Sequence, residues 1–125
     1  PEDLLAASIY FDLRPLAGAL GLAEPLLAFI HRRAAEVPRF CRQLAEEVLR
    51  NAAPLNWLGQ VETRVLDGAE VLDLKLHGTA IFVGVARLHA LALGLPEVNT
   101  RRRFEALARA RGLPERHCEA WVAAF

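Results

Sequence analysis

The sequence predicts a mainly α-helical fold, a bundle of about six helices with one β-hairpin over about residues 61–76. Two observations lead to this prediction. Apolar residues recur at helical spacing in segments that prolines and glycines separate, and one segment in the middle of the chain alternates apolar and polar residues. With 125 residues the chain has the length of one ordinary domain, so we expect residues 1–125 to form a single helical domain.

Three helices are expected before the hairpin. The first covers about residues 4–13, where Asp3 can serve as the N-cap and apolar residues at a spacing of four share one face. The second and third cover about residues 25–36 and 38–53, and each has a proline in its first turn. The second helix is expected to bury four apolar side chains: Leu26, Leu27, Phe29 and Ile30.

The hairpin is predicted by strand periodicity over residues 61–65 and by Asp67-Gly68, a strong signal for a tight turn. In the second strand, alternation would place Asp73 and Lys75 on one face and the neighbouring leucines on the other. Because a two-stranded hairpin is not stable alone, we expect the leucine face to lie on the helices or on a neighbouring domain.

Three helices are expected after the hairpin. The fourth covers about residues 79–93, the fifth runs from an Asn99 or Thr100 cap to Gly112, and the sixth begins at Pro114. The sixth is expected to turn four side chains inward: Cys118, Trp121, Val122 and Phe125.

Composition excludes several classes of function. Fifteen basic and fifteen acidic residues give a net charge of zero, which argues against a protein that coats nucleic acid but leaves room for a local site for one phosphate. Two cysteines form no disulfide scaffold, and the sequence shows neither a signal peptide nor a membrane-spanning stretch, so we expect a cytoplasmic protein. No nucleophile–base pair, metal-binding cluster or phosphate-binding glycine loop is recognisable, so no catalytic or metal-ligating residue is predicted.

Two groups of charged residues lie in otherwise apolar segments. Within residues 8–18, Asp12 and Arg14 form either an exposed ion pair or an arginine that Asp12 orients toward a phosphate or carboxylate. Asp73 and Lys75 form the second group. Lys75 is the only lysine beside fourteen arginines, which indicates either a need for a compact ammonium at a phosphate or chance.

A third group is the run of arginines at residues 101–103, at the start of a predicted helix. Positive charges there oppose the helix dipole, and an anionic partner would offset that cost. We therefore treat Arg101 and Arg103 as secondary anion contacts, with a solvated surface as the alternative.

These segments carry a resemblance to a known family. Residues 8–18, the block Asp73-Leu74-Lys75-Leu76-His77-Gly78, and residues 86–88 through Asn99-Thr100 resemble the nucleotidyltransferase substrate-binding domain. In bacteria this helical domain follows a polymerase-beta-like nucleotidyltransferase domain in predicted signal-transduction proteins, often with cyclic-nucleotide-binding and CBS domains. The resemblance therefore implies that this chain is a fragment of a larger nucleotidyltransferase.

The resemblance also implies a role and a set of binding residues. The carboxylates that hold Mg²⁺ would belong to the preceding catalytic domain, so this fragment would need no cofactor and would not transfer a nucleotide alone. It would close the active-site cleft and contact the nucleotide or the acceptor substrate. The residues implied for those contacts are Asp12, Arg14, Asp73, Lys75 and Arg87.

Two positions depart from the family pattern. Relatives usually have a proline near position 81 and an aspartate near position 84, where this chain has Ile81 and Gly84. The loss of that acid favours a second hypothesis, a helical regulatory or protein-interaction module that binds no nucleotide. An uncovered apolar face would also favour a homodimer.

Overall fold

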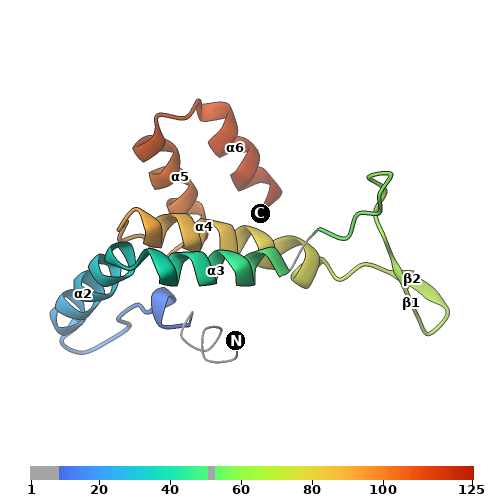
Figure 1. Ribbon diagram of the computed structural model, residues 1–125. Helices are drawn as coiled ribbons and strands as arrows, with labels where there is room; N and C mark the ends of the chain where they lie inside the picture. Colours follow the sequence, from blue (N-terminus) through green and yellow to red (C-terminus); the bar gives the residue numbers. More distant parts are fainter. Residues whose placement is uncertain (1–8, 51–52) are drawn as a thin grey trace.

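The computed structural model describes residues 9–50 and 53–125, and within them the chain is mainly helical with one antiparallel hairpin. Helices α3 and α4 lie side by side at the centre, α2 extends from one end of this pair, α5 packs on α4 and α6 on α5, and the hairpin projects from the other end (Figure 1). In chain order the elements are η1 (Ile9–Asp12), η2 (Leu20–Leu22), α2 (Ala23–Glu36), α3 (Pro38–Arg50), β1 (Arg64–Leu66), β2 (Ala69–Val71), η3 (Lys75–Thr79), α4 (Ala80–Ala92), α5 (Thr100–Arg111) and α6 (Glu115–Ala124).

The expected helices from the second to the sixth are present, and local capping signals explain their ends. The Asn99 side chain accepts a hydrogen bond from the Arg102 backbone N–H at 3.2 Å, so Asn99 is the N-cap of α5. Gly112 ends α5 in the left-handed conformation, at φ 61°. The first helix differs: its expected residues 4–8 lie outside the described residues, and its last turn is the 3₁₀ helix η1.

The core lies where α4 meets its neighbours. Ala34, Leu44 and Leu91 form a buried cluster from α2, α3 and α4, and Phe11, Phe40 and Leu88 pack against it. On the other side of α4, Phe104 lies between Phe82 and Trp121, with ring centroids 6.3 and 5.5 Å apart respectively. No helix in the described ranges has the length and apolar content to cross a lipid bilayer.

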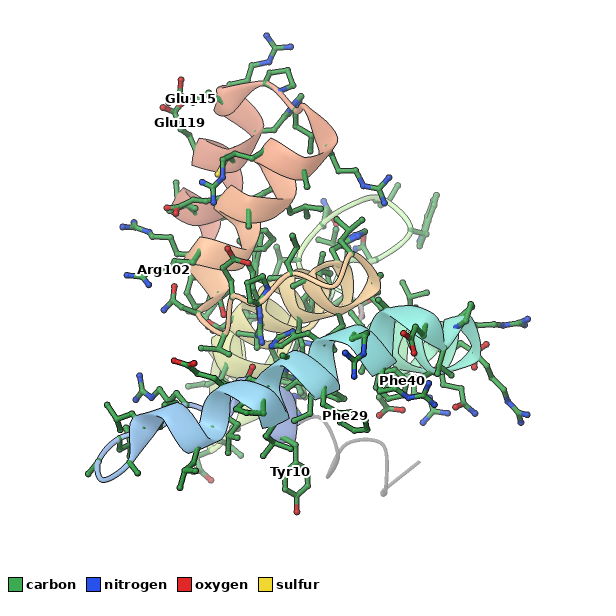
Figure 2. The ribbon with its side chains drawn as sticks, turned by 90° about the vertical axis from the view of Figure 1, so that its left-hand side faces the viewer. Tyr10, Phe29, Phe40, Arg102, Glu115 and Glu119 are labelled. Atoms are coloured by element: carbon green, nitrogen blue, oxygen red, sulfur yellow. The ribbon has the colours of Figure 1, made fainter. Side chains whose placement is uncertain are left out.

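Several side chains expected in the core are exposed. Leu26 and Phe29 of α2 are about half exposed, as is Phe125 at the end of α6. Tyr10 and Phe29 lie on the side of α2 turned away from α5 and α6 (Figure 2). The physical reason is that α2 contacts the rest of the bundle along a narrow stripe that buries His31 and Ala34, so of the four side chains expected to be buried only Leu27 and Ile30 are partly covered.

Gly84 marks a close approach of two helices. A Cβ atom placed on Gly84 would lie 2.9 Å from a methyl carbon of Val48, closer than carbon atoms pack without a shift. An aspartate could not occupy this position without moving α3 away from α4. In this chain, position 84 is therefore a helix-packing position, in place of the acid that the family pattern led us to look for.

The hairpin is shorter than predicted. Asp67 and Gly68 form its turn, both at positive φ, and β1 pairs with β2 from Arg64–Val71 to Leu66–Ala69. The placement of Asp73 and Lys75 on one face of a strand is wrong, because the strand ends at Val71 and a helix begins at Lys75. The Asp73 carboxylate accepts a hydrogen bond from the Leu76 backbone N–H at 2.9 Å, a capping contact that competes with strand pairing.

The described helices leave most of the expected leucine face, Leu72, Leu74 and Leu76, uncovered. Leu74 and Leu76 are exposed, whereas Leu72 is partly buried; Leu66 and Val65 of the hairpin are exposed, as are Leu55 and Leu58 before it. Trp57 is 92% exposed. We call residues 53–74 the arm, because they project from the bundle with their apolar side chains in solvent (Figure 1).

Candidate functional site

One group of charged residues ties three separate segments together. Asp12, at the end of η1, lies between Arg87 of α4 and Arg103 of α5. Arg103 Nη1 donates to Asp12 Oδ1 at 2.7 Å, and Arg87 donates to both carboxylate oxygens, from Nε to Oδ1 at 3.4 Å and from Nη2 to Oδ2. We call these three residues the ion triad. Together they carry one net positive charge in a half-buried setting.

Arg103 is the most deeply buried member of the ion triad. It is 1% exposed, and its other nitrogens donate to the carbonyls of Glu97 and Phe11, each at 2.8 Å. Burial lowers the pKa of Arg103, while the hydrogen bond and the charge of Asp12 oppose that shift. An arginine nonetheless stays protonated at neutral pH. All three of its side-chain nitrogens donate hydrogen bonds within the protein, so Arg103 has no free pair of N–H groups for an external anion.

A second group of charged residues lies at the root of the hairpin. A hollow of about 260 Å³ opens between the hairpin and the start of η3, and we call it the hairpin-root hollow. Its charged and polar lining comes from Glu62, Thr63, Arg64, Asp73 and His77. Arg64 Nη2 lies 4.0 Å from Asp73 Oδ2, and both side chains are largely exposed. Lys75, two residues after Asp73, is exposed and begins η3.

The electrostatics of this hollow are mixed. The hydrogen bond from the Leu76 backbone N–H lowers the pKa of Asp73, and the charges of Arg64 and His77 act in the same direction. Asp73 is therefore a carboxylate at neutral pH. His77 lines the hollow, and its Nδ1 atom is buried and makes no hydrogen bond with the described residues. The hollow can thus offer the Arg64 guanidinium to a phosphate, with Lys75 exposed in the adjoining first turn of η3.

The five principal residues implied by the resemblance do not lie in one place. Asp12 and Arg87 are in direct contact, whereas Asp73 lines the hairpin-root hollow and Lys75, in the first turn of η3, is not among its lining residues. At about 1.5 Å per residue, the helical segment that joins Lys75 to Arg87 places these two residues roughly 18 Å apart along the helix axis. Arg14, in the loop after η1, is exposed.

The secondary pair is also divided. Arg103 belongs to the ion triad, whereas Arg101 is exposed in the first turn of α5. One buried histidine was not singled out from the sequence: His31 of α2 is 5% exposed, and neither ring nitrogen has a hydrogen-bond partner among the described residues. Its position four residues after Leu27, on the buried stripe of α2, is the signal that could have found it.

The described residues do not fit a metal centre of their own. Nowhere in residues 9–50 and 53–125 do three or more histidine, cysteine, aspartate or glutamate side chains gather around one point. Glu62 and Asp73 line the same hollow, but two carboxylates fall short of the ligand set that a protein cage for a divalent ion needs.

The fold and the two charged groups define a small helical domain with a polar hollow and no metal centre in its described part. Comparison with protein families identifies it further. Residues 38–125 match the family described as "Putative nucleotidyltransferase substrate binding domain", so the chain belongs to that family. Neither the curated proteins nor the solved structures yield a match.

The matched range divides the charged groups. It includes Arg87, Arg103 and the whole hairpin-root hollow, but it begins after Asp12 and Arg14. The triad therefore joins two arginines of the matched domain to a carboxylate from the segment that precedes it.

Proposed function

We propose that this chain binds substrate for an adjacent nucleotidyltransferase domain, closes its active-site cleft, and contacts the nucleotide or the acceptor at the hairpin-root hollow. Membership of the substrate-binding-domain family supports the general role. The observation that carries the proposal is the hollow itself, where the exposed Arg64 lies beside Asp73 and His77, and Lys75 is exposed two residues after Asp73.

In this proposal the residues have separate tasks. Lys75 and Arg64 offset the charge of a phosphate. Asp73 fixes the start of η3 through its bond to Leu76 and so holds Lys75 in position. The ion triad keeps η1, α4 and α5 in register and does not touch the ligand. Mg²⁺ and the chemical step belong to the catalytic domain.

NMR titration of the ¹⁵N-labelled chain with ATP, GTP, CTP and UTP tests this proposal. We expect one or more of them to shift backbone signals of residues 62–64 and 73–77 in a saturable way. Lys75→Ala should weaken the binding by fivefold or more. Arg116→Ala, which also removes one exposed cation but on α6, is the control and should leave the affinity unchanged. Shifts confined to other residues, or equal affinity in both variants, would contradict the proposal.

The alternative is a regulatory or protein-interaction module that binds no nucleotide. The observation that favours it is the arm, whose exposed apolar side chains include Trp57 and Val65. Exposed apolar surface of this kind is typical of sites that contact other proteins. Absence of any nucleotide-dependent shift, together with protection of Trp57 from a soluble quencher on addition of the catalytic domain, would favour this alternative.

A further inference from the structure

One strand edge in the arm is open to another chain. β1 and β2 form a sheet of only two strands, so each strand has one edge without a partner strand among the described residues. Their tight turn is closed by the pair that flanks it, Leu66 and Ala69, which is therefore a hydrogen-bonded pair. Pairs alternate in type along an antiparallel ladder, so the next pair, Val65 and Glu70, is a non-hydrogen-bonded one. The backbone N–H and C=O of Val65 thus point away from β2, toward the open edge.

The same edge continues into the residues before β1. Val61 lies in an isolated antiparallel bridge whose hydrogen bonds are made by its neighbours, and one of them runs from the Glu62 N–H to the Pro54 carbonyl at 2.7 Å. Val61 and Thr63 themselves make no backbone hydrogen bond to another described residue. Because alternate residues of an extended chain direct their backbone groups to opposite edges, Val61, Thr63 and Val65 share the open edge. We call residues 61–65 the edge segment.

The edge segment is exposed along its whole length. Val61 is 57% exposed and Val65 is 73% exposed, although both are apolar. The hairpin projects from the end of the α3–α4 pair, so the described helices leave room for a second molecule beside it (Figure 1). An exposed edge of this kind pairs readily with a strand of another chain unless its side chains prevent the pairing.

The side chains of the edge segment are complementary to a second copy of the same segment. Its sequence, Val-Glu-Thr-Arg-Val, has valine at both ends, threonine at the centre, and charges of opposite sign between them. An antiparallel pair centred on Thr63 would place Glu62 opposite Arg64 of the second copy. In the same register, Val61 would lie opposite Val65 of the second copy, and the two threonines would face each other. Cross-strand pairs of all three kinds stabilise sheets.

The direction of the backbone groups agrees with this register. Hydrogen-bonded pairs form between residues whose N–H and C=O groups face each other across the two strands. The register pairs Val61 with Val65 and Thr63 with itself, and all of these residues direct their backbone groups to the open edge. Glu62 and Arg64 would then form non-hydrogen-bonded pairs, in which the side chains lie closer together. The two ion pairs would therefore be close contacts on one face of the joined strands.

The outer edge of β2 is less suited to pairing with itself. A symmetric pair centred on Glu70 would place two carboxylates directly opposite each other, which is destabilising. Charged residues normally protect a strand edge from a second copy for this reason. In the edge segment the two charges have opposite signs and symmetric positions, so the same register turns repulsion into attraction.

We infer that the edge segment binds a second copy of this chain as an antiparallel strand pair, with a two-fold axis at Thr63. Because each copy uses the same edge, the pairing closes at two copies. Two strands of this length bury less surface than a permanent dimer needs, so the dimer is weak and the chain is largely monomeric at the micromolar concentrations of fluorescence experiments. The inference does not rest on the proposed function. Lys75→Ala, which tests that function, leaves the edge segment unchanged, so either can fail alone.

Sedimentation equilibrium of the whole chain, from micromolar to millimolar concentration, tests the inference. We expect the average mass to rise from that of the monomer toward that of the dimer. Thr63→Pro removes the N–H at the two-fold axis and should weaken dimerisation at least tenfold. It should fold, because the Thr63 N–H makes no backbone hydrogen bond with the described residues. Thr63→Val keeps the N–H and a β-branched side chain, and this matched control should dimerise within about threefold of the wild type.

Two charge reversals test the register. Glu62→Arg and Arg64→Glu each place like charges opposite each other in the dimer, so each variant alone should dimerise at least tenfold more weakly than the wild type. In an equimolar mixture of the two variants, every charge at these positions faces the opposite sign, so mixed dimers should form about as well as wild-type dimers. The chain that carries both reversals should also dimerise like the wild type.

Three results would overturn the inference. The first is a monomer mass for the wild type up to millimolar concentration. The second is a dimer that Thr63→Pro leaves as stable as in Thr63→Val, which would mean that the open edge is not the interface. The third is a mixture of Glu62→Arg and Arg64→Glu that dimerises no better than either variant alone, which would exclude the register centred on Thr63.

Discussion

At the scale of single residues, the ion triad is the feature with the clearest energetic consequence. Arg103 is buried, and Asp12 supplies its only carboxylate contact among the described residues. Removal of one partner from a buried charge pair is strongly destabilising, because the other charge stays behind without compensation. Asp12 is itself 37% exposed in its side chain, which moderates the effect because water can replace part of its contact.

We predict that Asp12→Asn lowers the free energy of unfolding by about 1–3 kcal/mol, since it removes a hydrogen-bonded negative charge from two arginines. Urea unfolding followed by circular dichroism measures this quantity. Glu36→Gln is the control, because Glu36 forms an exposed ion pair with Arg33 within α2 and should change stability by less than about 0.5 kcal/mol. An equal effect of the two variants would mean that the triad contributes no more than a surface pair.

The buried His31 and the partly buried His89 predict the direction of the pH dependence of stability. Burial lowers the pKa values of His31 and His89 below their ordinary value of 6.5, and Arg103 and Arg111 respectively add to the shift. The unfolded chain therefore takes up protons near pH 6.5, whereas the folded chain does so only at lower pH. The stability contribution is present above about pH 6.5 and is lost as the pH falls through the folded-state values.

We therefore predict that the free energy of unfolding falls between pH 7.5 and pH 5.5, measured by urea unfolding at each pH. His31→Leu should reduce this fall, because one of the two contributing groups is removed. His117→Leu removes an exposed histidine and should leave the pH dependence as it is in the wild type. A fall that is identical in the wild type and in His31→Leu would exclude His31 as a contributor.

At the scale of elements, the contact of α3 with α4 depends on the absence of a side chain at position 84. Alanine normally stabilises a helix interior by about 1 kcal/mol relative to glycine. At Gly84, however, the added methyl would meet Val48, which as a β-branched residue in a helix has little freedom to move. Extra volume in a packed interface costs about 1–3 kcal/mol, which outweighs the gain in helix propensity.

We predict that Gly84→Ala lowers the free energy of unfolding by about 1 kcal/mol, the difference between these two effects. In a Val48→Ala background the same substitution should instead be stabilising, because the space is then open. Thermal unfolding of the two single variants and the double variant gives the coupling free energy between positions 48 and 84. Stabilisation by Gly84→Ala in the wild-type background would show that the two helices lie further apart than described here.

The elements also show how far sequence reasoning reaches in this protein. Caps and breakers act locally, and the ends of α5 at Asn99 and Gly112 were predictable because each depends on residues within one turn. The end of the second strand was not predictable from alternation, because Asp73 can serve either a strand or a helix cap. The burial of Arg103 was hidden for a different reason: its partner Asp12 is 91 residues away in the sequence.

At the scale of the whole molecule, the chain consists of a helical bundle and an arm that packing against the bundle stabilises little. A two-stranded hairpin is marginal alone in water, and no sequence rule indicated that Leu74 and Leu76 of the expected leucine face would remain in solvent. The two tryptophans report on these two parts separately. Trp57 is on the arm and 92% exposed, whereas Trp121 packs on Phe104 between α5 and α6.

We predict that acrylamide quenches the fluorescence of Trp57 strongly and that of Trp121 weakly in the isolated chain. Trp57→Phe should therefore leave a blue-shifted emission that resists quenching, while Trp121→Phe should leave a red-shifted emission that does not. Protection of Trp57 that increases with protein concentration would contradict a free arm and would instead indicate that the arm packs in a homodimer.

The position of Asp12 has a mechanical consequence. One carboxylate, between two guanidinium groups, links the segment before α2 to helices that come some 75 and 91 residues later. A force applied to η1 is therefore transmitted to α4 and α5 at the same time. Should η1 be drawn away, Arg103 would lose two of its three acceptors together, so release would be abrupt rather than gradual.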